Sequence, residues 1–411
     1  MKKTTQFSVV KPTLLVISVL LVFLCGIIQA EYIVAIQIVL LLFVARKVRI
    51  SQSFIALLLI LVLHTGICVL LGRDTIFLAV KQMVGIIVSY LFYKTIVKNK
   101  DDGLDALLVY KKFAIIIAVF ALIQQVAFYA HINVIYDLRW LVKGQLAPAN
   151  SVFRASTIFQ EPSECALILL PMAFMAMYLF WGKSKQELAP FISKKEAIII
   201  LLGYVATFSS AGYIGIFIGV IFIWLEYKHN LKQIIIFILG IAAFMIAYTK
   251  IGDFNERIND TLALISDDSR SLATANISSQ TIIINLKISL KSFADSCGLG
   301  GGIGSHPISY ERFIEDLPVS NVVFFFNKED ANSLLLRIIS ELGLFGLAGV
   351  VGFLFRFWPK RDGTFESIVG NMCITYFFLR LLRYGHYFNN GLLLFIIVFI
   401  LMKKEDEGNV S

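Results

Sequence analysis

Charged side chains interrupt strongly apolar stretches at several points of this sequence. The clearest case is DANSLLLRIISELGLFG, residues 330–346, in which Asp330, Arg337 and Glu341 accompany a run of leucine and isoleucine. Together with Ser333 they recur every three or four residues, so they share one face of a helix. A charge at the centre of a membrane helix costs about 2.5–3.5 kcal/mol and usually faces the bundle interior or a water-filled cavity. This polar stripe is therefore a candidate functional site.

Two arrangements of the stripe fit its spacing. Arg337 and Glu341 are one helical turn apart and could form an internal ion pair that locks helix packing. Alternatively, the stripe lines a cavity that opens to the outside of the membrane. A helix that begins near Asn332 would place Glu341 about 14 Å along its axis, close to the middle of a bilayer. Leucine would carry no insertion penalty at that depth, so we expect the open cavity.

A second polar stretch, FRASTIFQEPSECA at residues 153–166, precedes an apolar run. Pro162 suits the first turn of a helix, where its missing N–H needs no partner, and Glu161 and Glu164 suit the positive end of the helix dipole. Helix initiation does not explain Arg154, which lies where basic residues are otherwise scarce. Arg154 therefore predicts a bound anion.

A third stretch, FLRLLRYGHYFNN at residues 378–390, carries Arg380, Arg383 and His386 at three-residue spacing. Arginines at the outer end of a membrane helix run against the usual charge bias. They could extend to lipid headgroups, but guanidinium groups also bind phosphate through two parallel hydrogen bonds. We expect a phosphate-containing ligand here. Weaker candidates for the same cluster are Arg139, Lys143 and Lys81.

The glycine-rich stretch GLGGGIGSH, Gly298 to His306, does not open a βαβ unit and lacks the lysine of a phosphate-binding loop. We interpret it as a flexible turn and His306 as a loop histidine. No second ligand stands beside His306 at metal-binding spacing, and the five cysteines show no CxxC spacing, so we expect neither a metal site nor a disulfide framework. Small residues four apart at Ala211, Gly215 and Gly219 suit close helix packing.

These side chains must be positioned by membrane helices, because 58% of the 411 residues are hydrophobic and the mean hydropathy is +0.80. Apolar runs of spanning length predict an all-α polytopic membrane protein with about twelve transmembrane helices. The net charge of +9 arises from lysines and arginines that cluster in alternate loops. The positive-inside bias then places both termini in the cytoplasm, and it explains the basic charge without any nucleic acid.

Long polar connections divide the chain, and no internal repeat is evident. The larger connection, a large helical periplasmic loop, should contain helices of its own, since structureless loops of that length are uncommon. The predicted segments are an N-terminal transmembrane scaffold (1–131), a first periplasmic loop (132–163), central transmembrane helices (164–249), the large periplasmic loop (250–332), C-terminal transmembrane helices (333–402) and a cytoplasmic tail (403–411).

The chain resembles the Wzy-type O-antigen repeat-unit polymerases and, more distantly, the O-antigen ligases. The matching pieces are RASTIFQEPSE, FSSAGYIGIFIG, GLGGGIGS and DANSLLLRIISELGLFG, in this order between about residues 150 and 350. Ligases typically carry a His-Asn pair nine and eight residues before the glutamate of the last motif. Here Asn332 and Ser333 occupy those places, which favours a polymerase over a ligase. One departure from the family is Thr157, where a glycine often follows the arginine.

The resemblance implies a glycosyltransferase that needs no cofactor or metal and acts at the outer face of a bacterial inner membrane. Its substrates would be two polyprenyl-diphosphate-linked oligosaccharides, and a chain-length regulator would be a further partner beside the lipid bilayer. By this resemblance Glu341 or Glu161 would act as catalytic base. The residues expected to bind substrate are Arg154, Arg383, Arg380, Arg337, Arg139 and Asn332.

A flippase for the same lipid-linked unit would also place charges inside the membrane. The lack of a repeat and the large outer loop argue against a transporter, because many transporters are built from internal repeats.

Overall fold

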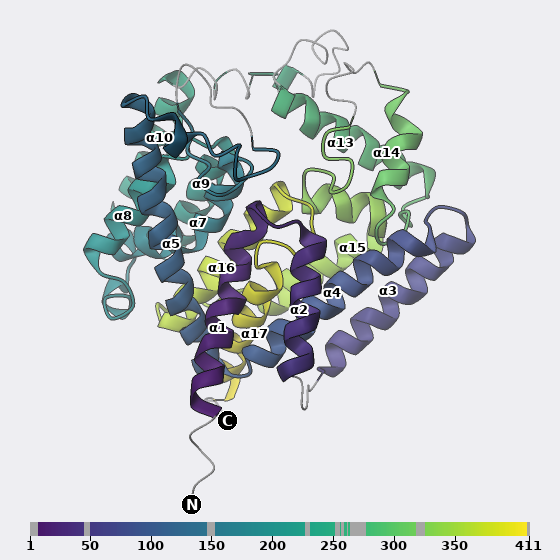
Figure 1. Ribbon diagram of the computed structural model, residues 1–411, viewed down its shortest axis with the longest axis horizontal. Coiled ribbons are helices and arrows are strands. Elements are labelled where there is room, and N and C mark those ends of the chain that lie inside the picture. Colours follow the sequence, from purple (N-terminus) through teal and green to yellow (C-terminus); the bar gives the residue numbers. More distant parts are fainter. Residues whose placement is uncertain are drawn as a thin grey trace, which may run out of the picture.

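The computed structural model describes residues 7–44, 50–145, 153–226, 231–250, 277–317 and 325–408, with 255, 259–260 and 262–263. This part of the chain is helical and contains no strand. Figure 1 shows a bundle in which α5 to α10 form one group and α3, α4 and α13 to α15 another. Helices α16 and α17 lie between the groups, since α16 contacts α7, α9 and α15 and α17 contacts α4 and α5.

In the described part of the chain, each predicted apolar run overlaps a helix. The helices are α1 (Phe7–Phe23), α2 (Ala30–Val44), α3 (Gln52–Leu70), α4 (Ile76–Ile96), α5 (Lys100–Tyr129), α6 (Asn133–Tyr136), α7 (Pro162–Trp181), α8 (Lys194–Val205), α9 (Ser210–Trp224), α10 (Leu231–Lys250), α13 (Ile277–Asp295), α14 (His306–Ile314), α15 (Leu334–Phe357), α16 (Phe365–Leu382) and α17 (Leu392–Gly408).

Six of the described helices, namely α3, α4, α5, α7, α15 and α16, are long and apolar enough to cross a membrane. Several leucines on α3 are exposed, among them Leu59, Leu63 and Leu70. A continuous apolar surface of this kind is typical of contact with lipid. Helices α13 and α14 lie within the large polar connection, which confirms that it contains helices in its described part.

Hydroxyl and amide side chains set where several helices begin. Ser51, Thr75, Asn99, Ser209 and Thr364 each precede a helix and accept a hydrogen bond from a backbone N–H of its first turn. Such caps satisfy donors that have no partner inside the helix, and each is worth about 0.5–2 kcal/mol. The start of α7 is different, because Glu161 takes the cap position without a side-chain bond and Pro162 takes the first turn, as predicted.

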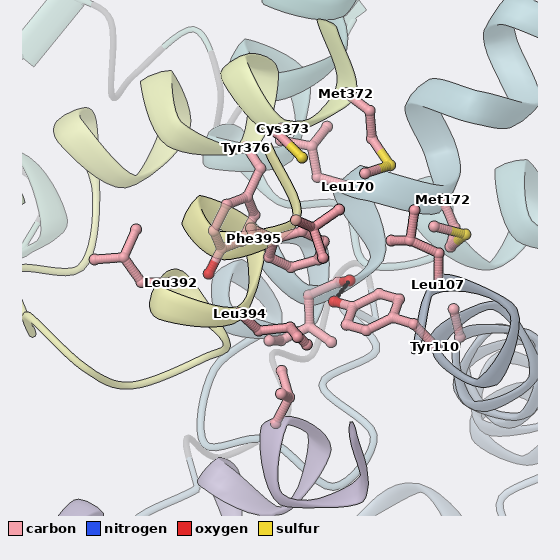
Figure 2. Packing of buried hydrophobic residues seen from close by; sticks show 14 of the residues in the cluster. Leu107, Tyr110, Leu170, Met172, Met372, Cys373, Tyr376, Leu392, Leu394 and Phe395 are labelled. Carbon is pink, nitrogen blue, oxygen red and sulfur yellow. Dashed lines mark hydrogen bonds between the residues drawn. The ribbon is translucent and has the colours of Figure 1, made fainter. Parts of the chain in front are cut away.

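Helix α7 forms the centre of the left-hand group in Figure 1, and almost its entire surface is buried. It packs against α8, α9 and α16. Figure 2 shows Leu170 and Met172 of α7 among Tyr110 of α5, Tyr376 of α16 and Phe395 of α17. The Tyr110 hydroxyl donates to the carbonyl of Ile168 at 2.7 Å, which satisfies the one polar atom of this buried ring.

The glycine stretch of residues 298–305 forms a turn, but it is an ordered packing element and the flexible-loop interpretation is wrong. Gly301 N–H donates to Ser340 O (2.9 Å), Gly302 N–H to Glu341 O (2.7 Å), and Leu344 N–H to Gly298 O (2.9 Å). The turn thereby caps the first half of α15, whose helix breaks at Gly343 with φ +54°. His306 is not a loop residue either, because it is the first residue of α14 and is fully buried.

The end of α3 closes over the other side of this turn. Thr65 Oγ1 accepts from Ile303 N–H at 3.2 Å, and Asp74, in the link to α4, is 94% buried, with 6% of its surface exposed. Asp74 Oδ1 accepts from Thr75 N–H at 2.7 Å, whereas Oδ2 has no hydrogen-bond partner within the described ranges. Burial, with a smaller contribution from the charge of Glu341, raises the pKa of Asp74 to about 7.

We expect Asp74→Asn to remove a pH-dependent loss of stability. The pKa of Asp74 is raised from 3.8 to about 7 on folding. The stability that protonated Asp74 contributes is therefore fully present below pH 4 and is lost as the pH rises through 7. At pH 8 the variant should be more stable by about 1–3 kcal/mol, because it buries no unsatisfied charge. Thermal unfolding in detergent at pH 4 and pH 8 measures this. Equal differences between the two proteins at both pH values would contradict it.

Candidate functional site

A cavity of about 560 Å³ lies where the first residues of α7, α9 and α13 meet the last residues of α16. It is on the side of the bundle where α13 lies in Figure 1, away from the start of α1 and the end of α17. Its charged lining residues are Arg154, Glu161 and Arg383. Its hydroxyl-bearing lining residues are Ser163, Ser209, Ser210, Ser278, Ser279 and Thr281.

The remainder of the cavity wall is largely apolar. Ile214 comes from α9, Leu379 and Leu382 from α16, and Ile277 and Ile282 from α13. A cavity with a few polar groups on an apolar wall is the usual form of a small-molecule site, and this volume falls within the range of such sites, about 300–1,000 Å³. The cavity can therefore hold an amphipathic ligand whose charged part meets the arginines.

Arg383 occupies the C-cap position of α16, where its backbone leaves the helix with φ −144°. Its side chain is 15% exposed, and its guanidinium group binds two partners. Nη2 donates to Glu161 Oε2 at 3.0 Å, and Nη1 donates to Asn332 Oδ1. Two partners from distant parts of the chain thus fix the orientation of the Arg383 guanidinium group, and Arg383 still borders the cavity.

Glu161 reaches the cavity because it precedes Pro162 at the start of α7, where the backbone is extended. Its side chain is 35% exposed. Besides Arg383, the hydroxyl of Ser163 donates to Glu161 Oε2 at 2.7 Å. The same hydroxyl lies 2.7 Å from the hydroxyl of Tyr384. An accessible carboxylate beside a cationic group and hydroxyls can accept a proton from a bound alcohol.

Arg154 lies on a third segment, which is attached to the link between α8 and α9. Ala155 N–H donates to Ala206 O at 3.1 Å, and Arg154 Nε donates to Phe208 O at 3.1 Å. This pairing brings Arg154 to the start of α9 and into the lining of the cavity. The structure therefore brings together Arg154, Glu161 and Arg383, three of the residues that the sequence singled out.

Arg337 and Glu341 are buried away from solvent, with side chains 1% and 0% exposed, and our expectation that they line an open cavity is wrong. The internal ion pair is the arrangement present, with Arg337 Nε 2.8 Å from Glu341 Oε1. The Glu341 carboxylate also accepts from Gly304 N–H (2.8 Å), His306 N–H (3.4 Å) and the Tyr387 hydroxyl (2.9 Å). Both oxygens of this carboxylate therefore accept hydrogen bonds from the protein itself.

Arg380 and Arg139 also lie outside the cavity lining. Arg380 is fully buried and donates through Nη2 to His386 O, while its Nε and Nη1 have no partner among the described residues. Arg139 is on the surface and binds Asp137 two residues earlier, Nη2 to Oδ2 at 2.6 Å. This hydrogen bond lowers the pKa of Asp137. Neither arginine is placed to share a ligand with Arg383 in this arrangement.

Asn332 accepts a hydrogen bond from Arg383 and does not belong to the cavity lining. It adopts φ +60°, a left-handed conformation that asparagine tolerates better than most residues, and is 2% exposed. Asp330 holds this turn, since its Oδ1 accepts from Asn327 Nδ2 (2.9 Å) and Asn332 N–H (3.1 Å). Burial by itself would raise the pKa of Asp330, but His386 and these hydrogen bonds bring it below its ordinary value. Asn332 therefore orients Arg383 and does not line the cavity itself.

The site also contains residues that the sequence did not single out, above all Ser163 and Tyr384. Ser163 is part of the quoted stretch before α7, and Tyr384 directly follows Arg383. The sequence could have indicated these two residues only by their position beside predicted site residues. Serine and tyrosine hydroxyls follow no characteristic spacing that would mark them as part of a site.

Comparison of the chain with models of protein families, with curated proteins and with solved structures finds no match. Its class is therefore defined by its own features: in the ranges that the structure describes, the chain is helical, six helices are suited to a membrane, and an amphipathic cavity bears two arginines and a glutamate.

Proposed function

We propose that this protein polymerises polyprenyl-diphosphate-linked oligosaccharide repeat units at the periplasmic face of a bacterial inner membrane. The observation that carries the proposal is the convergence of Arg154, Glu161 and Arg383 on one cavity of about 560 Å³. The resemblance of the four sequence motifs to the Wzy-type polymerases supports the same function. In this proposal about twelve helices cross the bilayer, and both termini are cytoplasmic.

In the proposed reaction the diphosphate of the donor binds Arg154 and Arg383. A hydroxyl of the acceptor sugar attacks the anomeric carbon of the donor chain. The new C–O bond forms as the bond from that carbon to the diphosphate oxygen breaks, and polyprenyl diphosphate leaves. Fixed guanidinium groups stabilise the negative charge that develops on the leaving group, an effect that is strongest where water is excluded.

Glu161 takes the proton of the attacking hydroxyl. Between the two carboxylates that the sequence left open, Glu161 is favoured because it is 35% exposed and borders the cavity, whereas Glu341 is enclosed by four donors. The apolar wall from α9 and α16 suits the first part of the lipid chain, and the hydroxyl-bearing residues of α13 suit a sugar.

A deletion strain tests this function against its alternatives. Loss of a polymerase should leave surface glycolipid capped with single repeat units, which run as one band on a gel in place of a ladder. Expression of the wild-type chain should restore the ladder. Loss of all capped glycolipid would instead indicate a ligase or a flippase, and an unchanged ladder would exclude all three.

A further inference from the structure

Tyr384 has a backbone conformation that is rare for an aromatic residue. Its φ is +64°, in the left-handed region that costs most residues about 1–2 kcal/mol. The conformation is held from both sides, because Tyr384 N–H donates to Asn332 O at 3.0 Å and Gly385 N–H donates to Asp330 Oδ2 at 3.2 Å. A side chain at Gly385 would meet Asp330 O at 1.6 Å. Strain that the surroundings maintain in this way is concentrated at functional sites.

This backbone conformation places the Tyr384 hydroxyl next to residues that border the cavity. It lies 2.7 Å from Ser163 Oγ, and Ser163 Oγ lies 2.7 Å from Glu161 Oε2. A serine hydroxyl has a single proton, and a carboxylate at neutral pH can only accept. Ser163 therefore donates to Glu161, and Tyr384 donates to Ser163. Burial raises the pKa of Tyr384 well above its ordinary value, which keeps this phenol protonated.

The result is a directed chain of hydrogen bonds that ends on one oxygen of Glu161. Oε2 accepts hydrogen bonds from the Ser163 hydroxyl at 2.7 Å and from Arg383 Nη2 at 3.0 Å. Oε1 accepts no hydrogen bond from the residues the structure describes. A general base works best when a neighbouring group fixes its orientation through one atom and leaves free the atom that accepts the proton. The carboxylate of Glu161 satisfies both conditions.

We propose that Ser163 and Tyr384 are positioning residues that fix Glu161 through Oε2 and so present Oε1 to the attacking hydroxyl. This inference rests on the proposed function, in which Glu161 accepts the proton. As the acceptor oxygen bonds to the anomeric carbon and the diphosphate oxygen departs, the hydroxyl proton moves to Oε1. The chain through Oε2 keeps its direction throughout, because Arg383 and Ser163 both donate to the carboxylate.

The test uses purified full-length protein in lipid vesicles and, as substrate, lipid-linked single repeat units extracted from the deletion strain. Tyr384→Phe and Ser163→Ala should each lower kcat about 10-fold, part of the about 10²–10⁴-fold that a general base contributes, with KM unchanged. Ser163→Thr keeps the hydroxyl and should restore most of the rate. The matched control is Tyr136→Phe, since the Tyr136 hydroxyl donates to Asn133 three residues earlier and Tyr136 is not part of the cavity lining.

A double variant separates positioning from a general effect on the fold. If Tyr384 acts through Ser163, Tyr384→Phe should have no further effect on kcat in a Ser163→Ala protein. Additive losses would overturn the inference, as would wild-type rates in both single variants. Glu161→Gln should abolish polymerisation, and full activity of that variant would also overturn it. Absence of any polymer with the wild-type protein would instead count against the proposed function.

Discussion

Arg383→Lys should reduce polymerisation about 100-fold or more, a loss typical of removing one preorganised donor from a developing oxyanion. Arg383 donates through Nη2 to Glu161 and through Nη1 to Asn332, and its planar fork still borders the cavity. A lysine ammonium is a single point of charge on a flexible stem, so it cannot hold both partners and a diphosphate in fixed geometry. The gel should show single repeat units in place of a ladder.

Arg312→Lys is the matched control for this substitution. Arg312 lies on α14 with 58% of its side chain exposed, and it pairs with Asp295 at 3.0 Å. It has no place in the lining of the cavity, so the ladder should be unchanged. Equal amounts of both variants in the membrane fraction are required for the comparison. A normal ladder from Arg383→Lys at normal abundance would remove Arg383 from the proposed phosphate site.

Glu341→Ala should lower the free energy of unfolding by about 3–5 kcal/mol, the usual effect of removing one partner from a buried ion pair. The substitution leaves Arg337 buried without its charge partner, 2.8 Å from where the carboxylate stood. It also deprives Gly304 N–H and the Tyr387 hydroxyl of their acceptor, which weakens the attachment of the glycine turn to α15. Thermal unfolding of the detergent-solubilised protein measures the loss.

Glu311→Ala provides the comparison, because Glu311 pairs with Lys328 on the surface and its side chain is 68% exposed. Surface pairs typically contribute below about 1 kcal/mol, so this variant should unfold close to the wild-type temperature. Glu341→Gln retains an acceptor for Gly304 but loses the charge, and it should fall between the two. The same unfolding temperature for Glu341→Ala and Glu311→Ala would show that the buried pair does not stabilise the fold.

The helices could be predicted from the sequence because their signals are local. Long apolar runs and capping residues such as Ser51 and Thr364 act within one or two turns, and the helices lie where these signals place them. Pro162 marked the start of α7 for the same reason. The close packing predicted at Gly215 and Gly219 is confirmed, since a Cβ there would lie 3.0 Å from Leu170 and 2.8 Å from Met177, closer than ordinary van der Waals contact.

The residues of the cavity could be predicted only as separate candidates. Arg383 and Glu161 are 222 positions apart in the sequence and still form an ion pair at 3.0 Å. No spacing rule connects them, because their distance depends on how the end of α16 packs against the start of α7. The positioning hydroxyls of Ser163 and Tyr384 belong to the same contact and share this limit.

The stripe on α15 separates what the sequence determined from what only the tertiary structure decided. The spacing of Arg337 and Glu341 was enough to place them on one face of a helix, since that depends on backbone geometry alone. Whether this face met water or protein depended on the distant segment Gly298 to His306, which covers Glu341 with its backbone N–H groups. Local geometry determines the direction of a side chain, whereas packing determines its surroundings.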